Sequence, residues 1–382
     1  MKKIISLFLA LVMSASVFTL IACDRTTGTG DDGRCAECVD FDTEVSYKID
    51  GMVMKIGNAC LECGYIPYPI EEIELTHVAS AEESNAITKI QDQNPNDDLV
   101  IGLKKGFYQQ IFVGSPDRKI HVVCESGTQV VIAQCNGSAD GVTFENMYFY
   151  TDPIEGGKMS QVKFETAGGS NYWSNIVVKN CVFEGKSKID SSWKNGVIDN
   201  MTIEGCTFKN LTGWGAGAGS ACAIFTDENW GETIIRDCVF DHIDYSAIRF
   251  GRVSTEGRCL VENCFFRDIK GNACIMFVAK NSTLQTDESI SQVDITLEVK
   301  NNVFADSKVF SFSKGLGKKS TASLDGQKLL EAQEFNARLA EYNAKLNVEF
   351  IVGPNTWVSI PTSVSKSTYY DIREQQIYEG EI

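Results

Sequence analysis

The segment "VVKNCVF" (177–183) recurs, with substitutions, in the central part of the chain. Its six copies are "TFENMYF" (143–149), "VVKNCVF" (177–183), "TIEGCTF" (202–208), "IIRDCVF" (234–240), "LVENCFF" (260–266) and "EVKNNVF" (298–304). The position two residues before Phe falls at 147, 181, 206, 238, 264 and 302, so the spacings are 34, 25, 32, 26 and 38 residues. Such a period indicates a repeat architecture. The irregular spacing predicts one short core per repeat, with loops of varied length between the cores.

The pattern within each copy predicts a strand with a sharp bend. In "VVKNCVF", Val178, Cys181 and Phe183 are expected to point inward, with Asn180 at the corner. The second outward position is charged in every copy, which favours one solvated face and one buried face. The residues at this position are Glu145, Lys179, Glu204, Arg236, Glu262 and Lys300.

A second strand follows several copies of the repeat. Its segments are "ACAIFT" (221–226), "SAIRFG" (246–251), "ACIMFV" (273–278) and "KVFSFS" (308–313). The expected inward pairs are Ala223/Phe225, Ile248/Phe250, Ile275/Phe277 and Phe310/Phe312. The pattern predicts two or three short strands per turn, stacked in parallel. The expected fold is therefore all-β, a right-handed parallel β-helix of the pectate-lyase-like solenoid type. Propellers and leucine-rich repeats have other periodic patterns.

Both ends of such a solenoid expose sheet edges that need cover. The segment "SAEESNAITKIQDQN" (80–94) is predicted to form an N-terminal capping helix. Near the other end, "LDGQKLLEAQEFNARLAEYNAKLN" (324–347) has Phe335, Leu339, Tyr342 and Leu346 on one stripe, which predicts a C-terminal amphipathic helix. The β-helix domain is therefore expected to span residues 79–382.

The cysteines of the repeat form one predicted group. Cys181, Cys206, Cys238 and Cys264 share an inward position, so they are expected to stack about 4.8 Å apart as small core side chains, with metal binding as the alternative. Met147 and Asn302 fill the same slot in other copies. Cys222 and Cys274 occur at matching places in the second strand, two coils apart and too distant for a disulfide.

The N-terminus predicts export and lipid anchoring. Lys2 and Lys3 precede an apolar run over residues 4–20, typical of a signal peptide (1–22). "LIAC" (20–23) resembles a bacterial lipobox, which makes Cys23 the expected lipidation site. An acidic, small-residue tether (23–34) follows. The expected location is the bacterial cell envelope, at the outer membrane or cell surface, with membrane contact through the lipid only.

Residues 35–78 are expected to form a small cysteine-rich β module. "CAEC" (35–38) and "CLEC" (60–63) flank a hairpin with Asp50-Gly51 at its turn. The spacing of Cys35, Cys38, Cys60 and Cys63 resembles a zinc ribbon. An exported chain also oxidises such cysteines, so bound zinc, two disulfides and free thiols stay open.

The overall charge restricts the partners. The net charge of −16 argues against nucleic acid and against docking on anionic lipid. Binding of a polyanionic sugar would require local basic groups or a bridging cation.

The stretch "SAIRFGRVSTEGRCLVENCFFRDIKGNACIMFVAKNS" (246–282) resembles the core of the family 6 polysaccharide lyases, the chondroitinase B and alginate lyase type. The resemblance covers about residues 246–315. It implies calcium-assisted β-elimination on an acidic polysaccharide, with a lysine as base and an arginine assisting the leaving oxygen.

The family's catalytic positions are altered in this chain. Its two calcium-binding carboxylates fall on Asn272 and Cys274, and its lysine falls on Ala279, with Lys280 next to it. The family arginine falls on Ser313, beside Lys314. The resemblance therefore leaves Arg249 and Lys280 as the candidate catalytic residues, and calcium as a cofactor only of an active lyase.

The repeat itself predicts a ligand-binding stripe on an outer face, with Trp193, Trp214 and Trp230 nearby as sugar-stacking rings. Its residues are Lys163, Glu165, Lys188, Asp190, Asp227, Arg249 and Lys280. We expect this stripe to bind, and in an active lyase to cleave, an acidic polysaccharide. The alternative is a surface adhesin or structural repeat protein without a sugar ligand.

Lipidation of Cys23 makes a direct prediction. Cys23→Ala removes the only acceptor of the lipid, so the variant is expected to move from the membrane fraction to the soluble fraction of lysed cells. An unchanged membrane fraction on ultracentrifugation would contradict lipid anchoring.

Overall fold

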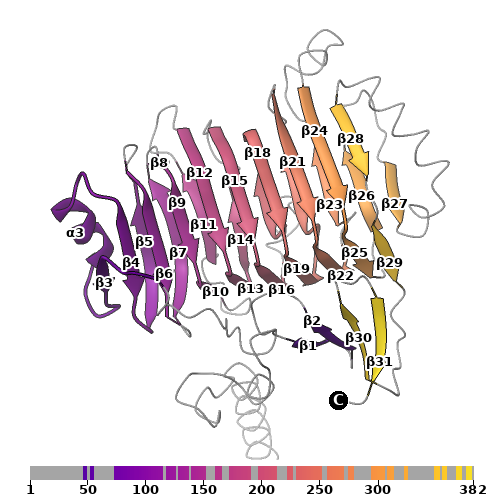
Figure 1. Cartoon of the computed structure of the whole chain (residues 1–382), viewed down its shortest axis with the longest axis horizontal. Helices are drawn as coiled ribbons and strands as arrows, with labels where there is room; N and C mark the ends of the chain where they lie inside the picture. The colour runs from indigo at the N-terminus through magenta and orange to yellow at the C-terminus, as the bar shows by residue number, and fades with distance from the viewer. Residues whose placement is uncertain are drawn as a thin grey trace, which may run out of the picture.

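The computed structural model of the chain is a long stack of parallel strands (Figure 1). It describes residues 73–305 except 115–117, 126–127, 137–138, 152–159, 166–171, 191–196, 213–221, 227–228, 252–255, 271–273 and 279–293. It also describes eight further short segments nearer the two ends of the chain: 46–49, 52–55, 308–313, 322–325, 348–352, 355–358, 367–371 and 376–380.

One sheet of 11 strands forms the first face of the stack, called face A here. Neighbouring strands of this sheet pair in parallel, and they follow one another across the sheet in the order of the sequence. They are β3 (His77–Ala79), β4 (Leu99–Leu103), β6 (Ile120–Cys124), β9 (Val142–Glu145), β12 (Tyr172–Lys179), β15 (Val197–Glu204), β18 (Asn229–Arg236), β21 (Glu256–Glu262), β24 (Asp294–Lys300) and β28 (Val348–Val352), with β8 (Ala139–Asp140) beside β12.

A second sheet of 16 strands has two arms that meet at β7 (Gln129–Asn136), which also pairs with β5 (Phe107–Val113). One arm, face B, contains β10 (Tyr148–Thr151), β13 (Val182–Gly185), β16 (Thr207–Leu211), β19 (Val239–Ile243), β22 (Phe265–Ile269), β25 (Val303–Ala305) and β29 (Thr356–Val358). The other arm, face C, contains β11 (Ser160–Glu165), β14 (Ser187–Asp190), β17 (Ile224–Thr226), β20 (Ile248–Gly251), β23 (Ile275–Val278), β26 (Lys308–Ser313) and β27 (Ala322–Asp325). Only the β26–β27 pair of this sheet is antiparallel among the described pairings.

Each turn of the chain adds one strand to each face. The strands β12, β13 and β14 form one such coil, and β15, β16 and β17 form the next. Two parallel sheets stacked in register in this way make a β-solenoid, which confirms the repeat architecture predicted from the six copies.

The bend between faces A and B depends on one backbone conformation. The turn residue of every copy has a positive φ, between 51° and 62°, as a left-handed corner requires. Asn, Asp and Gly adopt this conformation at the lowest cost, and only these types occur there, as the pattern predicted. The six residues are Asn146, Asn180, Gly205, Asp237, Asn263 and Asn301.

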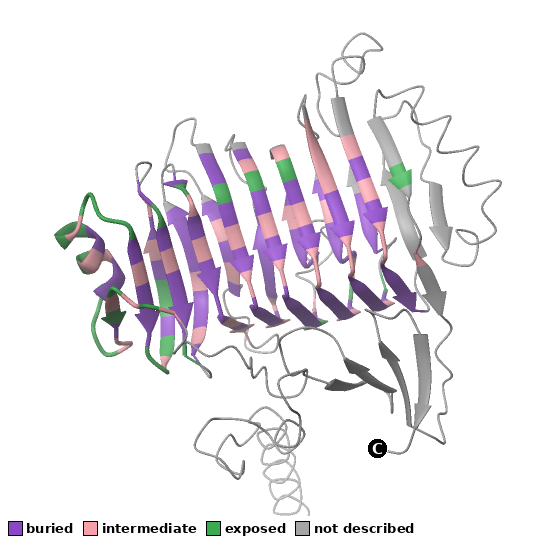
Figure 2. Ribbon diagram, viewed as in Figure 1, coloured by how far each residue is buried: buried purple, intermediate pink, exposed green. Residues whose placement is uncertain are grey.

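The Phe that closes each copy forms a continuous stack in the interior. Neighbouring ring centroids lie 4.7 to 4.9 Å apart, and the rings are within 12° of parallel. The separation follows the strand spacing of about 4.8 Å, because residues in register repeat at that distance. The members are Phe149, Phe183, Phe208, Phe240, Phe266 and Phe304, all buried (Figure 2).

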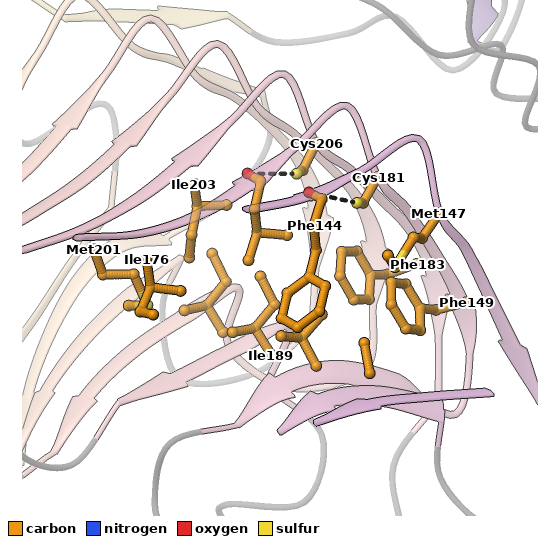
Figure 3. Packing of buried hydrophobic residues seen from close by; sticks show 14 of the residues in the cluster. Phe144, Met147, Phe149, Ile176, Cys181, Phe183, Ile189, Met201, Ile203 and Cys206 are labelled. Carbon is orange, nitrogen blue, oxygen red and sulfur yellow. Dashed lines mark hydrogen bonds between the residues drawn. The ribbon is translucent and has the colours of Figure 1, made fainter. Parts of the chain in front are cut away.

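The cysteines of the repeat line the same interior, beside the corner, as Figure 3 shows for Cys181 and Cys206. All four are fully buried, which confirms that they stack in the core. Each thiol donates a weak hydrogen bond to a carbonyl of the preceding coil, such as Cys181 Sγ to Phe144 O at 3.7 Å. In a later coil Asn302 makes the equivalent bond through Nδ2 to Val261 O, at 2.9 Å.

The predicted inward pair Ala223/Phe225 is wrong by one residue. Ile224 pairs in register with Ile248, and Phe225 pairs with Arg249, so Phe225 lies on the outer side of face C. A slip of one residue turns every side chain of a strand to the opposite face. The same slip separates Cys222 from Cys274, because Ile248 is in register with both Ile224 and Ile275.

The charged outward positions of face A form a ladder of alternating sign. Along six coils the order is Glu145, Lys179, Glu204, Arg236, Glu262 and Lys300. Neighbours form ion pairs at 3.7 Å (Lys179–Glu145), 2.7 Å (Arg236–Glu204) and 3.7 Å (Lys300–Glu262). The face that the pattern predicted as solvated therefore neutralises its own charges.

The two ends of the chain contribute smaller elements. Helix α3 (Ala86–Gln93) lies at the N-terminal end of the stack, inside the segment 80–94 (Figure 1). A separate four-stranded sheet joins the hairpin of β1 (Ser46–Ile49) and β2 (Met52–Lys55) to the hairpin of β30 (Ser367–Asp371) and β31 (Gln376–Gly380). The predicted helix over 324–347 lies outside the described residues from position 326 onward.

The phenylalanine stack predicts a large stability effect. Phe208 is fully buried between Phe183 and Phe240, so Phe208→Ala is expected to lower the free energy of unfolding by about 3–5 kcal/mol. Phe107→Ala is the matched control, because 54% of Phe107 is exposed. If the denaturant midpoints of Phe208→Ala and Phe107→Ala shift equally, the phenylalanine stack adds nothing to the free energy of unfolding.

Candidate functional site

Face C brings several of the predicted stripe residues into one outward column. Lys163 is in register with Asp190, Asp190 with Phe225, and Phe225 with Arg249. The residues between them on each strand, such as Ile189 and Ile248, are fully buried in the core, so the column points away from the interior. Three steps of about 4.8 Å give the column a length of roughly 14 Å.

A buried ion pair lies within this column. Lys188 Nζ is 2.5 Å from Asp190 Oδ2, on the same outer side of β14, and the side chains are only 8% and 2% exposed. Burying both charges costs desolvation energy that their attraction offsets, and loss of either partner would strand the other. Lys188 is therefore neutralised locally and adds little free positive charge to the face.

The ring of Phe225 supports two cations. The Arg249 guanidinium carbon lies 4.4 Å from the ring centroid, and Lys188 Nζ lies 5.9 Å from it. Both distances are within the range of cation–π attraction. The sequence interpretation missed Phe225 because it placed the ring in the core. One signal was present: aligning Ile224 with Ile248 places an isoleucine at the same inward position of "IFT" (224–226) and "IRF" (248–250).

Arg249 differs from the other arginines in the described part of the chain. Arg236, Arg258 and Arg267 each form ion pairs with carboxylates, at 2.7, 3.1 and 2.6 Å, and Arg118 donates to backbone carbonyls. Arg249 makes no ion pair within the described residues; its Nε is buried without a hydrogen-bond partner, as are the Nε atoms of Arg118 and Arg236. Among the described residues, therefore, no carboxylate neutralises the Arg249 guanidinium.

Arg249 also influences two weakly acidic neighbours. Burial raises the pKa of the Cys222 thiol to about 12, although Arg249 and Lys188 oppose the shift. Burial likewise raises the pKa of Tyr245, with Arg249 again opposing. Neither group is ionised near neutral pH, so neither neutralises Arg249.

The remaining members of the predicted stripe are placed only in part. Glu165 belongs to β11, two residues beyond Lys163, and its backbone pairs with Asn136. Asp227 and Lys280 lie outside the described residues, as do Trp193 and Trp214. The cysteines Cys23, Cys35, Cys38, Cys60 and Cys63 also lie outside them.

The described residues do not fit the calcium site that the lyase resemblance implies. Cys274, at one of the two carboxylate positions, is fully buried in the hydrophobic core. Calcium requires several hard oxygen ligands, and a buried thiol supplies none. In the part of the chain that the structure describes, no group of three or more His, Cys, Asp or Glu side chains is arranged to hold a metal ion.

A second charged cluster lies on face B. Arg267 Nε and Nη2 bind both oxygens of Asp241, at 2.6 and 2.8 Å, and both side chains are buried. His242 Nδ1 lies 2.8 Å from Asp241 Oδ1, and its Nε2 lies 3.6 Å from Asp268 Oδ2. Asp241 already neutralises the charge of Arg267. This cluster is therefore a weaker candidate for binding an external anion than Arg249.

Comparison with known proteins identifies no relative: no family model, curated protein or solved structure matches the chain. No helix among the described residues has both the length and the apolar character needed to cross a membrane.

The environment of His242 predicts a pH dependence of stability. The hydrogen bond to Asp241 raises the pKa of His242 above its usual value, so protonated His242 stabilises the fold. That contribution is complete below about pH 6.5, the unfolded-state pKa, and is lost as pH rises through the folded-state pKa.

The measurement compares the free energy of unfolding of the parent chain and His242→Gln from about pH 5.5 to 8.5. The difference in free energy between the two chains is expected to shrink with increasing pH. Arg267 Nη2, 3.3 Å from His242 Nδ1, opposes protonation of the imidazole and so reduces the size of the effect. A difference that is constant over this range would contradict the coupling.

Proposed function

We propose that this chain is a lipid-anchored protein of the bacterial cell envelope whose face C binds an acidic polysaccharide. The supporting observation is Arg249, whose guanidinium is held over Phe225 and forms no ion pair with a carboxylate among the described residues. Guanidinium groups bind carboxylates through charge-assisted, often bidentate hydrogen bonds.

The chemistry of the column suits a sugar chain. Phe225 supplies an apolar ring and Arg249 an anion contact, while the buried Lys188–Asp190 pair keeps β14 neutral beneath them. Binding sites for small polar ligands combine apolar rings with a few oriented polar groups in this way.

The finer features of the fold belong to the same proposal. The solenoid is right-handed and of the pectate-lyase type, since parallel crossover connections are nearly always right-handed. Helix α3 caps its N-terminal edge, as its contacts with β5 favour: Gln91 Nε2 donates to Phe112 O at 2.7 Å. The quartet of Cys35, Cys38, Cys60 and Cys63 holds zinc or two disulfides.

Elimination chemistry is not expected from this site. The reaction requires a base near the proton to be removed and a cation that neutralises the uronate. Ala279 and Cys274 stand at the positions that the lyase resemblance assigns to these roles, and Cys274 is buried in the core. Arg249 retains binding capacity without either group.

Retention on immobilised alginate, chondroitin or dermatan tests the binding. Arg249→Ala is expected to weaken retention about ten- to hundredfold, because a hydrogen bond to a charged group contributes roughly 1.5–3 kcal/mol. Arg258→Ala is the matched control, since Arg258 pairs with Glu232 on face A. In high salt the parent chain and Arg249→Ala should converge.

Equal retention of the parent and both variants would contradict the role of Arg249, and a parent chain that none of the three polysaccharides retains would favour the surface adhesin or structural repeat protein instead. The same samples test catalysis through the ultraviolet absorbance of unsaturated product, which should stay at baseline. Product that disappears in Lys280→Ala and with a chelator would instead identify an active lyase.

A further inference from the structure

The interior slot beside the corner holds five sulfur atoms in consecutive coils. Met147 occupies the slot in the first coil, and Cys181, Cys206, Cys238 and Cys264 occupy it in the next four. All five side chains are fully buried, and Figure 3 shows Met147, Cys181 and Cys206 following one another along the corner. We call these five residues the sulfur row.

The register of the backbone fixes the spacing of the row. Val182 N donates to Met147 O, Thr207 N to Cys181 O, Val239 N to Cys206 O and Phe265 N to Cys238 O, each at 2.9 Å. Strands bonded in this way lie about 4.8 Å apart. Zinc–thiolate bonds are about 2.3 Å long, so two metal–sulfur bonds of that length in a line would span roughly 4.6 Å, close to the separation of adjacent coils.

From this match we propose that the sulfur row binds monovalent thiophilic ions, Cu(I) or Ag(I), between successive coils. Thiolate and thioether ligands select such soft ions, and linear coordination requires only two sulfurs per ion. The proposal agrees with the absence of clusters of three or more ligands among the described residues, because a two-coordinate ion needs no such cluster. Zinc and calcium, which need at least four ligands, are excluded from the row.

The charge balance of the row favours a monovalent ion. Each ion replaces one thiol proton, so that RSH and M⁺ give RSM and H⁺, while a lone pair of the neighbouring sulfur completes the coordination. The row stays uncharged, as a buried site requires.

The hydrogen-bonding role of the slot does not itself require sulfur. Asn302 donates to Val261 O at 2.9 Å, and Asn355 in the following coil donates to Val299 O at 3.0 Å. An amide thus makes the bond to the preceding coil that each thiol makes at 3.5 to 3.7 Å. Five adjacent sulfurs provide, in addition, a continuous set of soft ligands.

The test loads the reduced full-length chain with Ag(I), since buried thiols exchange slowly with solvent. The chain is refolded from denaturant with Ag(I) under anaerobic conditions and desalted, and bound silver is counted by elemental analysis. Cys206→Val/Cys238→Val interrupts the row while keeping the core apolar. Cys135→Val/Cys222→Val is the matched control, because it removes two equally buried thiols outside the row.

The row variant is expected to lose at least two bound silver ions relative to the parent, and the control none. Proton release should fall by the same number, and X-ray absorption should show two sulfur neighbours per silver in a linear arrangement. The N-terminal cysteines contribute equally to all three chains, so the difference reports the row alone.

Equal silver content in the row variant and the control would overturn the proposal, as would silver without two sulfur neighbours. Should the double variant fail to refold by circular dichroism, Cys206→Ala alone divides the row. Its silver content must then fall below that of Cys222→Ala, or the proposal is rejected.

Discussion

The side-chain rows of the solenoid depend on the in-register hydrogen bonding of parallel strands between successive coils. This ladder places equivalent residues about 4.8 Å apart, so each sequence position becomes a continuous row. The phenylalanine rings stack at 4.7 to 4.9 Å for this reason, and the sulfur row and the charge ladder follow the same spacing. The left-handed corners keep the ladder in register, because Asn180, Gly205 and their equivalents turn the chain at the same point of each coil.

Register also decides which side chains face a ligand. In β17 a shift of one residue relative to the expected alignment moves Phe225 from the core to the outer side, where it meets Arg249. The loop before β17 contains nine residues outside the described part of the chain, 213–221, and loop length is free to vary between coils. An alternating pattern has only two phases, so an error of one residue exchanges interior and exterior completely.

The distribution of charge explains why one arginine stands out in a chain of net charge −16. Face A pairs acids and bases of neighbouring coils, and face B buries Arg267 against Asp241. On face C the only acid in the described column, Asp190, is bound to Lys188. Arg249 therefore rests on an aromatic ring and forms no ion pair with a carboxylate among the described residues.

The sequence by itself determined the repeat, the parallel all-β class, the corner residues and the burial of the phenylalanine and cysteine positions. These follow from local alternation and from the few residue types that tolerate a positive φ, as in Asn146 and Asp237. Only the tertiary structure decided the phase of β17, the pairing of Lys188 with Asp190, and the position of Arg249 over the ring of Phe225. The contact of Phe225 with Arg249 joins different coils, so it depends on loop lengths that an alternating pattern does not encode. Lys188 and Asp190 lie on one strand, β14, where alternation places both side chains on the same side but does not show that they pair.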